Sequence, residues 1–134
     1  MLELGTLEGF LQYHDMFVVK DVGLTLQEGV RLKPRPCLKE DQYEIHGNEV
    51  CQRAVELKGN RSLADGFYLR DNQDSMLGEF PEFIYILLPG TLLRGSDGKD
   101  YMAQLYYDGD RWSITCLLFD YKHDRDDYLA CNDK

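Results

Sequence analysis

The chain has 134 residues, with 24 Asp and Glu against 15 Lys and Arg, which gives a formal charge of −9 at pH 7. That length favours a single domain, residues 1–134, and an apolar share of 43% is too high for a disordered chain. The charge argues against nucleic acid or an anionic membrane as the partner, and the longest apolar run, 83–88, is far below the roughly 20 residues that span a bilayer.

The N-terminal residues predict a short helix followed by a strand. Apolar residues recur at helical spacing over 7–14, and Thr6 is a suitable N-cap. Residues 16–19 are rich in β-branched side chains, as is typical of a strand. Glu3 and Glu8 interrupt the first apolar residues, so this end lacks the pattern of a secretory signal, and we expect a cytoplasmic protein.

Residues 24–32 alternate between apolar and polar about Glu28 and Gly29, which predicts a β-hairpin. The following segment, 31–39, contains two prolines, and each proline removes a backbone donor and favours an extended chain. We therefore expect this segment to be an exposed loop or the edge of a sheet.

The next residues predict a strand and then the clearest helix of the chain. Tyr43 and Ile45 alternate with polar residues, which indicates a strand. Residues 49–58 carry one apolar stripe at helical spacing. Asn48 can cap that helix, and Gly59 can supply the left-handed residue after its end.

The middle of the chain, 60–80, has no clear periodicity, and the sequence predicts a short strand at 67–69 followed by a polar loop at 70–75. The run 83–88 is apolar without alternation, as expected of a strand covered on both faces. Pro89 and Gly90 have the chemistry of a type II turn, so we expect the strand to end there.

A hairpin about Gly109 and Asp110 is the strongest local prediction. A two-residue loop at this point pairs the strands from Tyr107 opposite Trp112 to Tyr101 opposite Leu118. Alternate pairs are then apolar on both strands and face the core, whereas the other face carries an ion pair, hydroxyls and amides. A slip of one residue would mix the two faces, so the register is well specified.

The last segment, 121–134, is mostly charged, and we expect a solvated and partly frayed end. It holds the densest group of metal-ligand types in the chain: His123, Asp124, Asp126, Asp127 and Cys131. A solvated acidic tail explains that composition without a metal, so no metal site is predicted there.

The cysteines have none of the short spacings of a structural zinc site, and we expect them to be reduced. An even number permits two disulfides in three arrangements, but a core of this size does not need them. The four are Cys37, Cys51, Cys116 and Cys131.

Signatures of catalysis are missing, and no cofactor is expected. No serine lies in a G-x-S-x-G motif, and the histidines show no metal-binding spacing. The segment 95–100 lacks the spacing of a calcium loop and the ending of a phosphate loop. A Cys–His enzyme stays open, because its catalytic partners need only be close in space.

Negative charge is concentrated in the second half of the chain. Residues 68–134 hold thirteen acidic and seven basic residues, twice the net negative charge of residues 1–67. Most of the acids fall in predicted loops and are interleaved with tyrosines, which make good interface contacts. We predict a partner-binding surface made of Asp71, Asp74, Glu79, Glu82, Asp97, Asp100, Tyr106, Asp108 and Asp110.

Together the elements predict an α+β fold with a mainly antiparallel, twisted sheet of about five to seven strands and one or two short helices packed on it. In size, charge and tyrosine content the chain is similar to the broad group of bacterial immunity and inhibitor proteins, small cytosolic domains that cover the active surface of a toxin. That resemblance is one of general character and assigns no residue roles. It implies a small non-catalytic module that binds a basic toxin or nuclease, or a phage anti-defence inhibitor.

Three other interpretations stay open. In the first interpretation, the acidic loops serve only to keep the protein soluble. In the second the chain is a small-molecule- or metal-binding domain, or a small hydrolase, with a pocket beneath the sheet. In the third it is a subunit of a larger assembly, with residues 83–88 at an interface.

Overall fold

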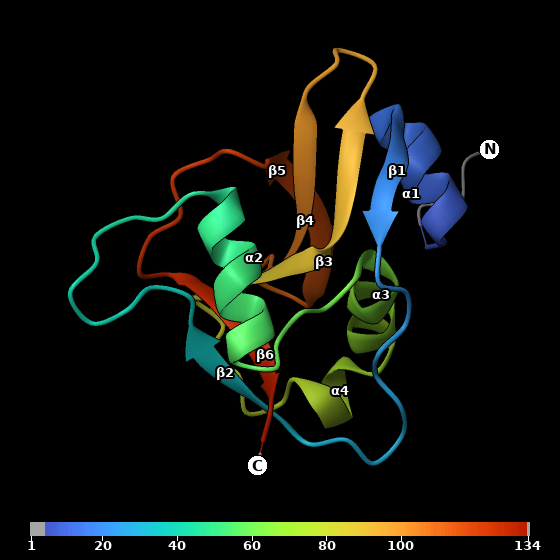
Figure 1. Ribbon diagram of the computed structural model, residues 1–134. Helices are drawn as coiled ribbons and strands as arrows, with labels where there is room; N and C mark the ends of the chain where they lie inside the picture. The colour runs from blue at the N-terminus through green and yellow to red at the C-terminus, as the bar shows by residue number, and fades with distance from the viewer. Residues whose placement is uncertain (1–4, 134) are drawn as a thin grey trace.

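The computed structural model describes residues 5–133. The strands are β1 (Met16–Asp21), β2 (Leu32–Pro36), β3 (Tyr85–Gly95), β4 (Asp100–Tyr107), β5 (Trp112–Leu118) and β6 (Asp127–Asn132). The helices are α1 (Leu7–His14), α2 (Gly47–Glu56), α3 (Leu63–Asp71) and α4 (Gln73–Met76). One six-stranded sheet has the order β2-β6-β3-β4-β5, with β1 also paired to β3 (Figure 1).

The expected α+β class with a mainly antiparallel sheet is confirmed, and β3 with β6 is the parallel pair. The helices are more numerous than the one or two expected. Within residues 5–133 the longest is α2, with ten residues, which is too short to cross a bilayer.

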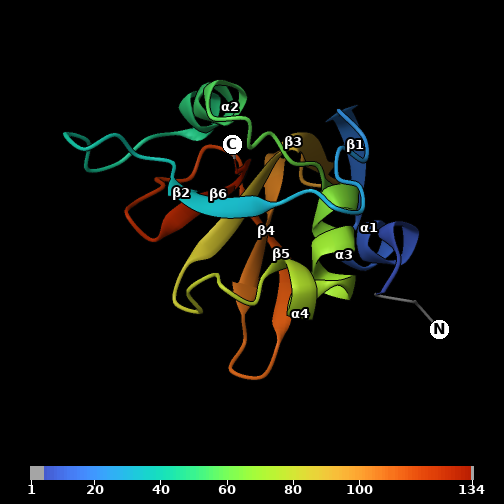
Figure 2. The ribbon, with the colours of Figure 1, turned by 90° about the horizontal axis from the view of Figure 1, so that it is seen from below.

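The sheet is covered by helices on both faces (Figure 2), and β3 lies between the two resulting cores. Ile86 and Leu88 pack with α3 residues on one face, whereas Leu87 packs with α2 residues on the other. The prediction of a strand covered on both faces is therefore confirmed for residues 86–88, whereas Phe83 lies before β3 and both Phe83 and Tyr85 are exposed. The predicted turn at residues 89–90 is wrong, because β3 continues to Gly95 with an irregularity in its pairing with β4.

Gly90 does not form a turn; it lies in β3, in close contact with the backbone of Arg61. Its backbone N–H donates to the carbonyl oxygen of Arg61 at 2.6 Å. A Cβ atom at this position would lie 2.7 Å from the same oxygen, so only glycine permits the approach. The glycine thus lets β3 contact the chain that leads into α3.

The β4–β5 hairpin has the predicted register at every pair from Tyr107 with Trp112 to Tyr101 with Leu118. Leu105, Ala103 and Trp112 are buried on the α3 side of the sheet. The other side carries half-buried polar residues near the turn, as the alternation predicts. The predictions of α1 with its Thr6 cap, of β1 and of an edge at residues 31–39 are also confirmed.

The predicted hairpin over residues 24–32 is wrong, because a buried carboxylate binds the backbone that would have paired. Asp65, which is fully buried, accepts from the N–H groups of Thr25 at 2.7 Å and Leu26 at 3.0 Å. It also accepts from the Thr25 hydroxyl and from Ser62 N, both within 2.8 Å. The segment is held as an ordered loop with Leu26 in the core.

Residues 67–69 lie in α3 and not in a strand. Ser62 and Asp65 form a capping box, in which each side chain accepts from the other residue's backbone N–H. The segment 43–45 also differs from the prediction, since only Ile45 pairs, in an isolated bridge to His123. Tyr43 is 83% exposed.

The C-terminal segment is the largest departure from the sequence prediction. β6 is not a frayed end, because it lies inside the sheet between β2 and β3. Leu129, Ala130 and Cys131 are fully buried there. This strand forms by pairing with β2 and β3, which lie far away in the sequence, so the local pattern does not predict it.

The ends of α2 also differ from the prediction. His46 occupies the N-cap position, and Lys58, with φ 57°, takes the left-handed conformation expected of Gly59. Gly59 instead packs closely against β6, where an added Cβ would lie 2.7 Å from Cys131 Sγ.

Candidate functional site

The turn between β4 and β5 is built around Asp108. Its carboxylate accepts from the backbone N–H groups of Asp110 and Arg111, both at 2.9 Å, and from the Ser113 hydroxyl at 3.2 Å. These donors, the Arg111 N–H first, lower the pKa of Asp108. Gly109 completes the turn with φ 100°. The turn is therefore rigid and fully exposed at one end of the sheet.

A side chain of α4 fixes two further acids beside this turn. Gln73 accepts from Trp112 N at 2.8 Å and donates to Trp112 O at 3.3 Å. Asp71 and Asp74, on either side of Gln73, are consequently held next to the start of β5. Asp71, Asp74 and Asp110 line one surface hollow.

Glu82 approaches the same turn from another side, and Glu79 lies one hollow further away, beside Asp74 and Arg31. Glu82, Asp74 and Asp110 share a second hollow, and Glu79 and Asp74 share a third. The Tyr107 hydroxyl lies among them and donates to Asp110 O at 3.0 Å. Burial, and then the charges of Glu82, Asp110 and Asp108, raise the pKa of Tyr107.

The structure therefore brings together six of the nine predicted site residues. We call this group the acidic tip: Asp71, Asp74, Glu79, Glu82, Asp108 and Asp110. All six are exposed. Asp71 pairs with Arg70 at 3.0 Å. Five have no ion-pair partner among residues 5–133: Asp74, Glu79, Glu82, Asp108 and Asp110.

Asp97 and Asp100 lie apart from the acidic tip, at the opposite end of β4. Asp97 accepts from Tyr101 Oη at 2.6 Å and Lys99 N at 3.0 Å, and these bonds, the Tyr101 hydroxyl first, lower its pKa. Asp100 pairs with Arg94 at 2.8 Å. Their carboxylates are occupied within the β3–β4 turn.

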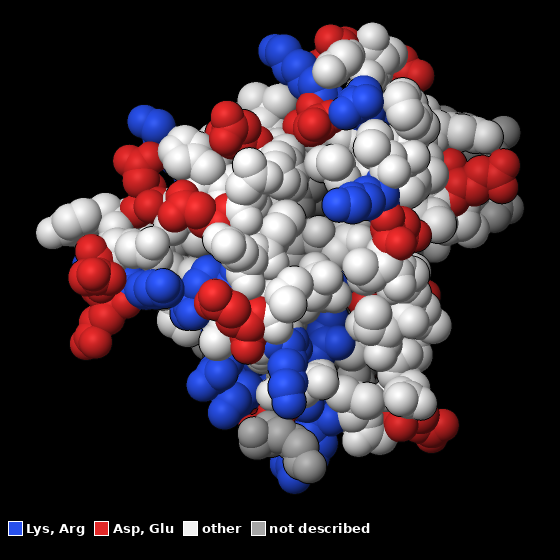
Figure 3. Space-filling view, in the orientation of Figure 1, with Lys and Arg blue, Asp and Glu red and all other residues white. Residues whose placement is uncertain are grey.

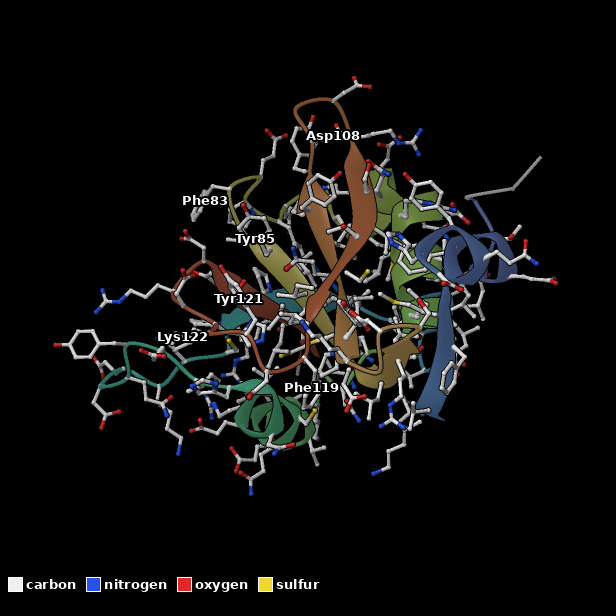
Figure 4. All side chains as sticks on the ribbon, turned by 90° about the horizontal axis from the view of Figure 1, so that it is seen from above. Phe83, Tyr85, Asp108, Phe119, Tyr121 and Lys122 are labelled. Atoms are coloured by element: carbon white, nitrogen blue, oxygen red, sulfur yellow. The ribbon has the colours of Figure 1, made fainter. Side chains whose placement is uncertain are left out.

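Tyr106 is half-buried on the hairpin and lines a hollow together with Arg70 and Asp71 of α3. The β3–β4 register, extended by one residue, sets Tyr106 beside Tyr85, which is 41% exposed. Phe83 is 69% exposed at the start of this strand (Figure 4). These aromatic side chains and the acidic tip flank the same end of β3 and β4. Sequence reasoning missed Phe83 and Tyr85 because an apolar run predicts burial for all its members.

A Cys–His pair is also present, as the sequence left open. Cys116 Sγ lies 3.6 Å from His14 Nδ1, beside a hollow of about 690 Å³. Burial raises the pKa of Cys116 to about 11 and lowers that of His14. A thiol with a raised pKa is a poor nucleophile, because the thiolate is the reactive form.

The ligand-type side chains of the C-terminal segment do not gather into one cluster among the described residues. His123 is fully buried, and its Nδ1 lies 3.3 Å from Asp127 Oδ2 without hydrogen-bond geometry at either ring nitrogen. Within residues 5–133, no three His, Cys, Asp or Glu side chains are arranged to hold a metal ion. All four cysteines are free thiols.

Basic side chains gather at another end of the molecule. Arg35, Arg61, Arg53 and Lys33 all lie close enough to Cys131 to lower its pKa, although burial outweighs them and raises it. Figure 3 shows Lys and Arg concentrated near β2 and the C-terminus, with Asp and Glu spread elsewhere on that face. The charge is therefore unevenly distributed.

Comparisons of the chain with protein-family models, with curated proteins and with solved structures found no match.

Proposed function

We propose that this chain is a non-catalytic protein-binding module that captures a basic protein through the acidic tip. The observation that carries the proposal is the grouping of six exposed carboxylates from three separate segments of the sequence, five of them without an ion-pair partner among the described residues. An immunity protein or comparable inhibitor must bind a basic toxin or nuclease through such a surface, and so must a phage anti-defence inhibitor.

Electrostatics supports a role in capture. Like charges held close together repel, so gathering these carboxylates costs stability, apart from the hydrogen bonds that Asp108 accepts within its own turn. Opposed fields at two protein surfaces raise association rates from about 10⁵–10⁶ toward 10⁸–10⁹ M⁻¹s⁻¹ at low salt. An inhibitor that must reach a nuclease before the nuclease reaches nucleic acid benefits from that rate.

The neighbouring aromatic residues supply the apolar part of such an interface. Phe83 and Tyr85 are exposed beside the tip, and Tyr106 adds a further ring and hydroxyl. Aromatic side chains are enriched in the packed centres of protein interfaces. The four free thiols fit action in the reducing cytoplasm, which is where we propose that the protein works.

The test compares two triple variants with equal changes in net charge. One neutralises the tip with Asp74→Asn, Glu82→Gln and Asp110→Asn, and the control carries Glu28→Gln, Glu40→Gln and Asp41→Asn at exposed residues elsewhere. Immobilised wild-type and variant chains are used to capture proteins at low and high salt, and the association rate of each purified partner is then measured.

We expect the tip variant to associate at least about tenfold more slowly at low salt, with a weaker salt dependence, while the control matches the wild type. Equal rates for the two variants, or binding that is indifferent to salt, would refute capture through the tip. The product of an adjacent reading frame is the first partner to test directly.

A second function is favoured by the hollow between α1 and the hairpin. Its volume of about 690 Å³ would accommodate a small molecule, and Arg70, Arg111 and Tyr106 line it. A thermal-shift screen of metals and metabolites tests this function, because a ligand raises Tm through RT ln(1 + [L]/Kd). A rise of several degrees with one metabolite would favour a ligand-binding domain over the capture module.

A further inference from the structure

The turn between α1 and β1 places two side chains able to bind a metal, His14 and Met16, beside a third from β5, Cys116. α1 ends at His14 and β1 begins at Met16, with Asp15 between them in the left-handed conformation, φ 55°. Cys116 Sγ, in the middle of β5, lies 3.6 Å from His14 Nδ1 and 3.9 Å from Met16 Sδ. An imidazole, a thioether and a thiol thus converge.

These separations match those between ligands of one metal ion. First-row metals bind sulfur at about 2.3 Å and imidazole nitrogen at about 2.0 Å, so two ligands of the same ion lie roughly 3.6–4.0 Å apart. The ligand types select the ion, because thiolate and thioether sulfur are soft donors that favour Cu(I). Zinc sites instead use thiolate, imidazole and carboxylate.

We propose that His14, Met16 and Cys116 form a binding site for a soft monovalent metal ion, with Cu(I) as its first candidate. One Cu(I) ion and one thiolate sum to zero charge, which suits the half-buried position of all three side chains. A divalent ion would leave a net positive charge in the same place.

The surroundings prepare the ligands. The rings of Phe10 and Tyr13 contact the imidazole, with centroid separations of 4.4 and 5.0 Å, and restrict its orientation. His14 also lines the surface hollow beside α1, which gives an ion a route from solvent.

Binding exchanges a proton for the ion. The S–H bond of Cys116 breaks, a copper–sulfur bond forms, and one proton leaves to water for each ion bound. Copper stays in the +1 state, so no oxidant or reductant is consumed. The affinity therefore rises with pH.

The test titrates Cu(I) into the full chain under anaerobic reducing conditions, in competition with a colorimetric Cu(I) chelator. We expect one ion bound per chain and one proton released. Cys116→Ser should lower the affinity by at least about 100-fold, and Met16→Leu or His14→Gln by at least about tenfold each. Cys51→Ser removes the other half-buried thiol and should bind as the wild type does.

Two results would overturn the site: an unchanged affinity in Cys116→Ser, or no Cu(I) withdrawn from the chelator by the wild type. Circular dichroism confirms that each variant is folded. X-ray absorption at the copper edge gives an independent readout, with one nitrogen and two sulfur neighbours expected. A shell of sulfur alone would contradict the role of His14.

Discussion

The buried junction at Asp65 and the acidic tip use the same chemical group in opposite ways. Asp65 accepts four hydrogen bonds, from Thr25, Leu26 and Ser62, and has no exposed surface. The tip carboxylates are exposed, and most of them have no cation partner among the described residues. The fold uses all the bonding capacity of Asp65, whereas in the tip it binds Asp108 and Asp71 and leaves the other four carboxylates without an ion pair within residues 5–133.

The junction joins three parts of the chain that are distant in sequence. Arg61, also buried, donates to Thr25 Oγ1 at 3.0 Å and to Ala130 O at 2.8 Å, so Thr25 connects its charge to that of Asp65. Asn132 accepts a further bond from Arg61. Negative charge is therefore structural where it is buried and paired, and available where it is exposed and unpaired.

The largest expected effect is that of Asp65→Ala. The substitution leaves the N–H donors of Thr25, Leu26 and Ser62 without their acceptor and removes the carboxylate charge near the buried Arg61, which should lower the free energy of unfolding by about 3–5 kcal/mol. Urea unfolding measures it. Asp71→Ala, at an exposed ion pair, is the control and should cost less than about 1 kcal/mol. Equal losses of unfolding free energy in Asp65→Ala and Asp71→Ala would contradict the distinction between the buried junction and the exposed tip.

Thr25→Val keeps the shape of the side chain and removes the hydroxyl between Arg61 and Asp65. We expect a loss of about 1–3 kcal/mol in the free energy of unfolding, because two buried charged groups each lose one partner. Thr115→Val, at a half-buried position on the open sheet face, is the control. A junction variant no less stable than this control would contradict the proposed connection.

Low pH should reduce stability through Asp97 and Asp108, the carboxylates held by hydrogen bonds in the two turns at the ends of β4. Hydrogen bonds lower the folded-state pKa of Asp97 and Asp108, so their contribution to stability is present above the unfolded pKa of about 4 and is lost as pH falls further. Tm measured from pH 7 to pH 2.5 should fall less steeply in Asp97→Asn and Asp108→Asn than in the wild type. Parallel curves would argue against this role.

The smallest effect on stability is expected at the tip itself. The triple variant Asp74→Asn, Glu82→Gln and Asp110→Asn reduces the repulsion within the tip, and the glutamine introduced by Glu82→Gln can still accept from the Tyr107 hydroxyl, so the free energy of unfolding should change by less than about 0.5 kcal/mol. Urea unfolding again provides the measurement. A large destabilisation would show that these carboxylates are structural and would weaken the capture proposal.

Local patterns predicted the elements that local interactions form. The β4–β5 register follows from a two-residue turn and from alternation on both strands, all within residues 101–118. α1 follows from its cap and its apolar spacing. α3 had a readable signal as well, since Ser62 and Asp65 have capping-box spacing, but the β-favouring residues 67–69 outweighed it in the prediction.

The candidate site was predicted in part. The acids of the turns could be named from charge and loop position, but which of them converge depends on how α4 docks on the hairpin through Gln73. No sequence signal joins His14 and Met16 to Cys116, because the contact spans 100 residues. Asp65 reads as one more helix acid until its buried partners are seen.

The sequence by itself determined the class of fold, the central apolar strand, the hairpin register and the surplus of negative charge, because each depends on composition or on neighbours within a few residues. The tertiary structure alone decided that the charged C-terminal segment is an interior strand, that residues 24–32 form a loop bound to Asp65, and which carboxylates stay unpaired. These outcomes depend on partners distant in the chain, where burial and hydrogen bonding override local preference.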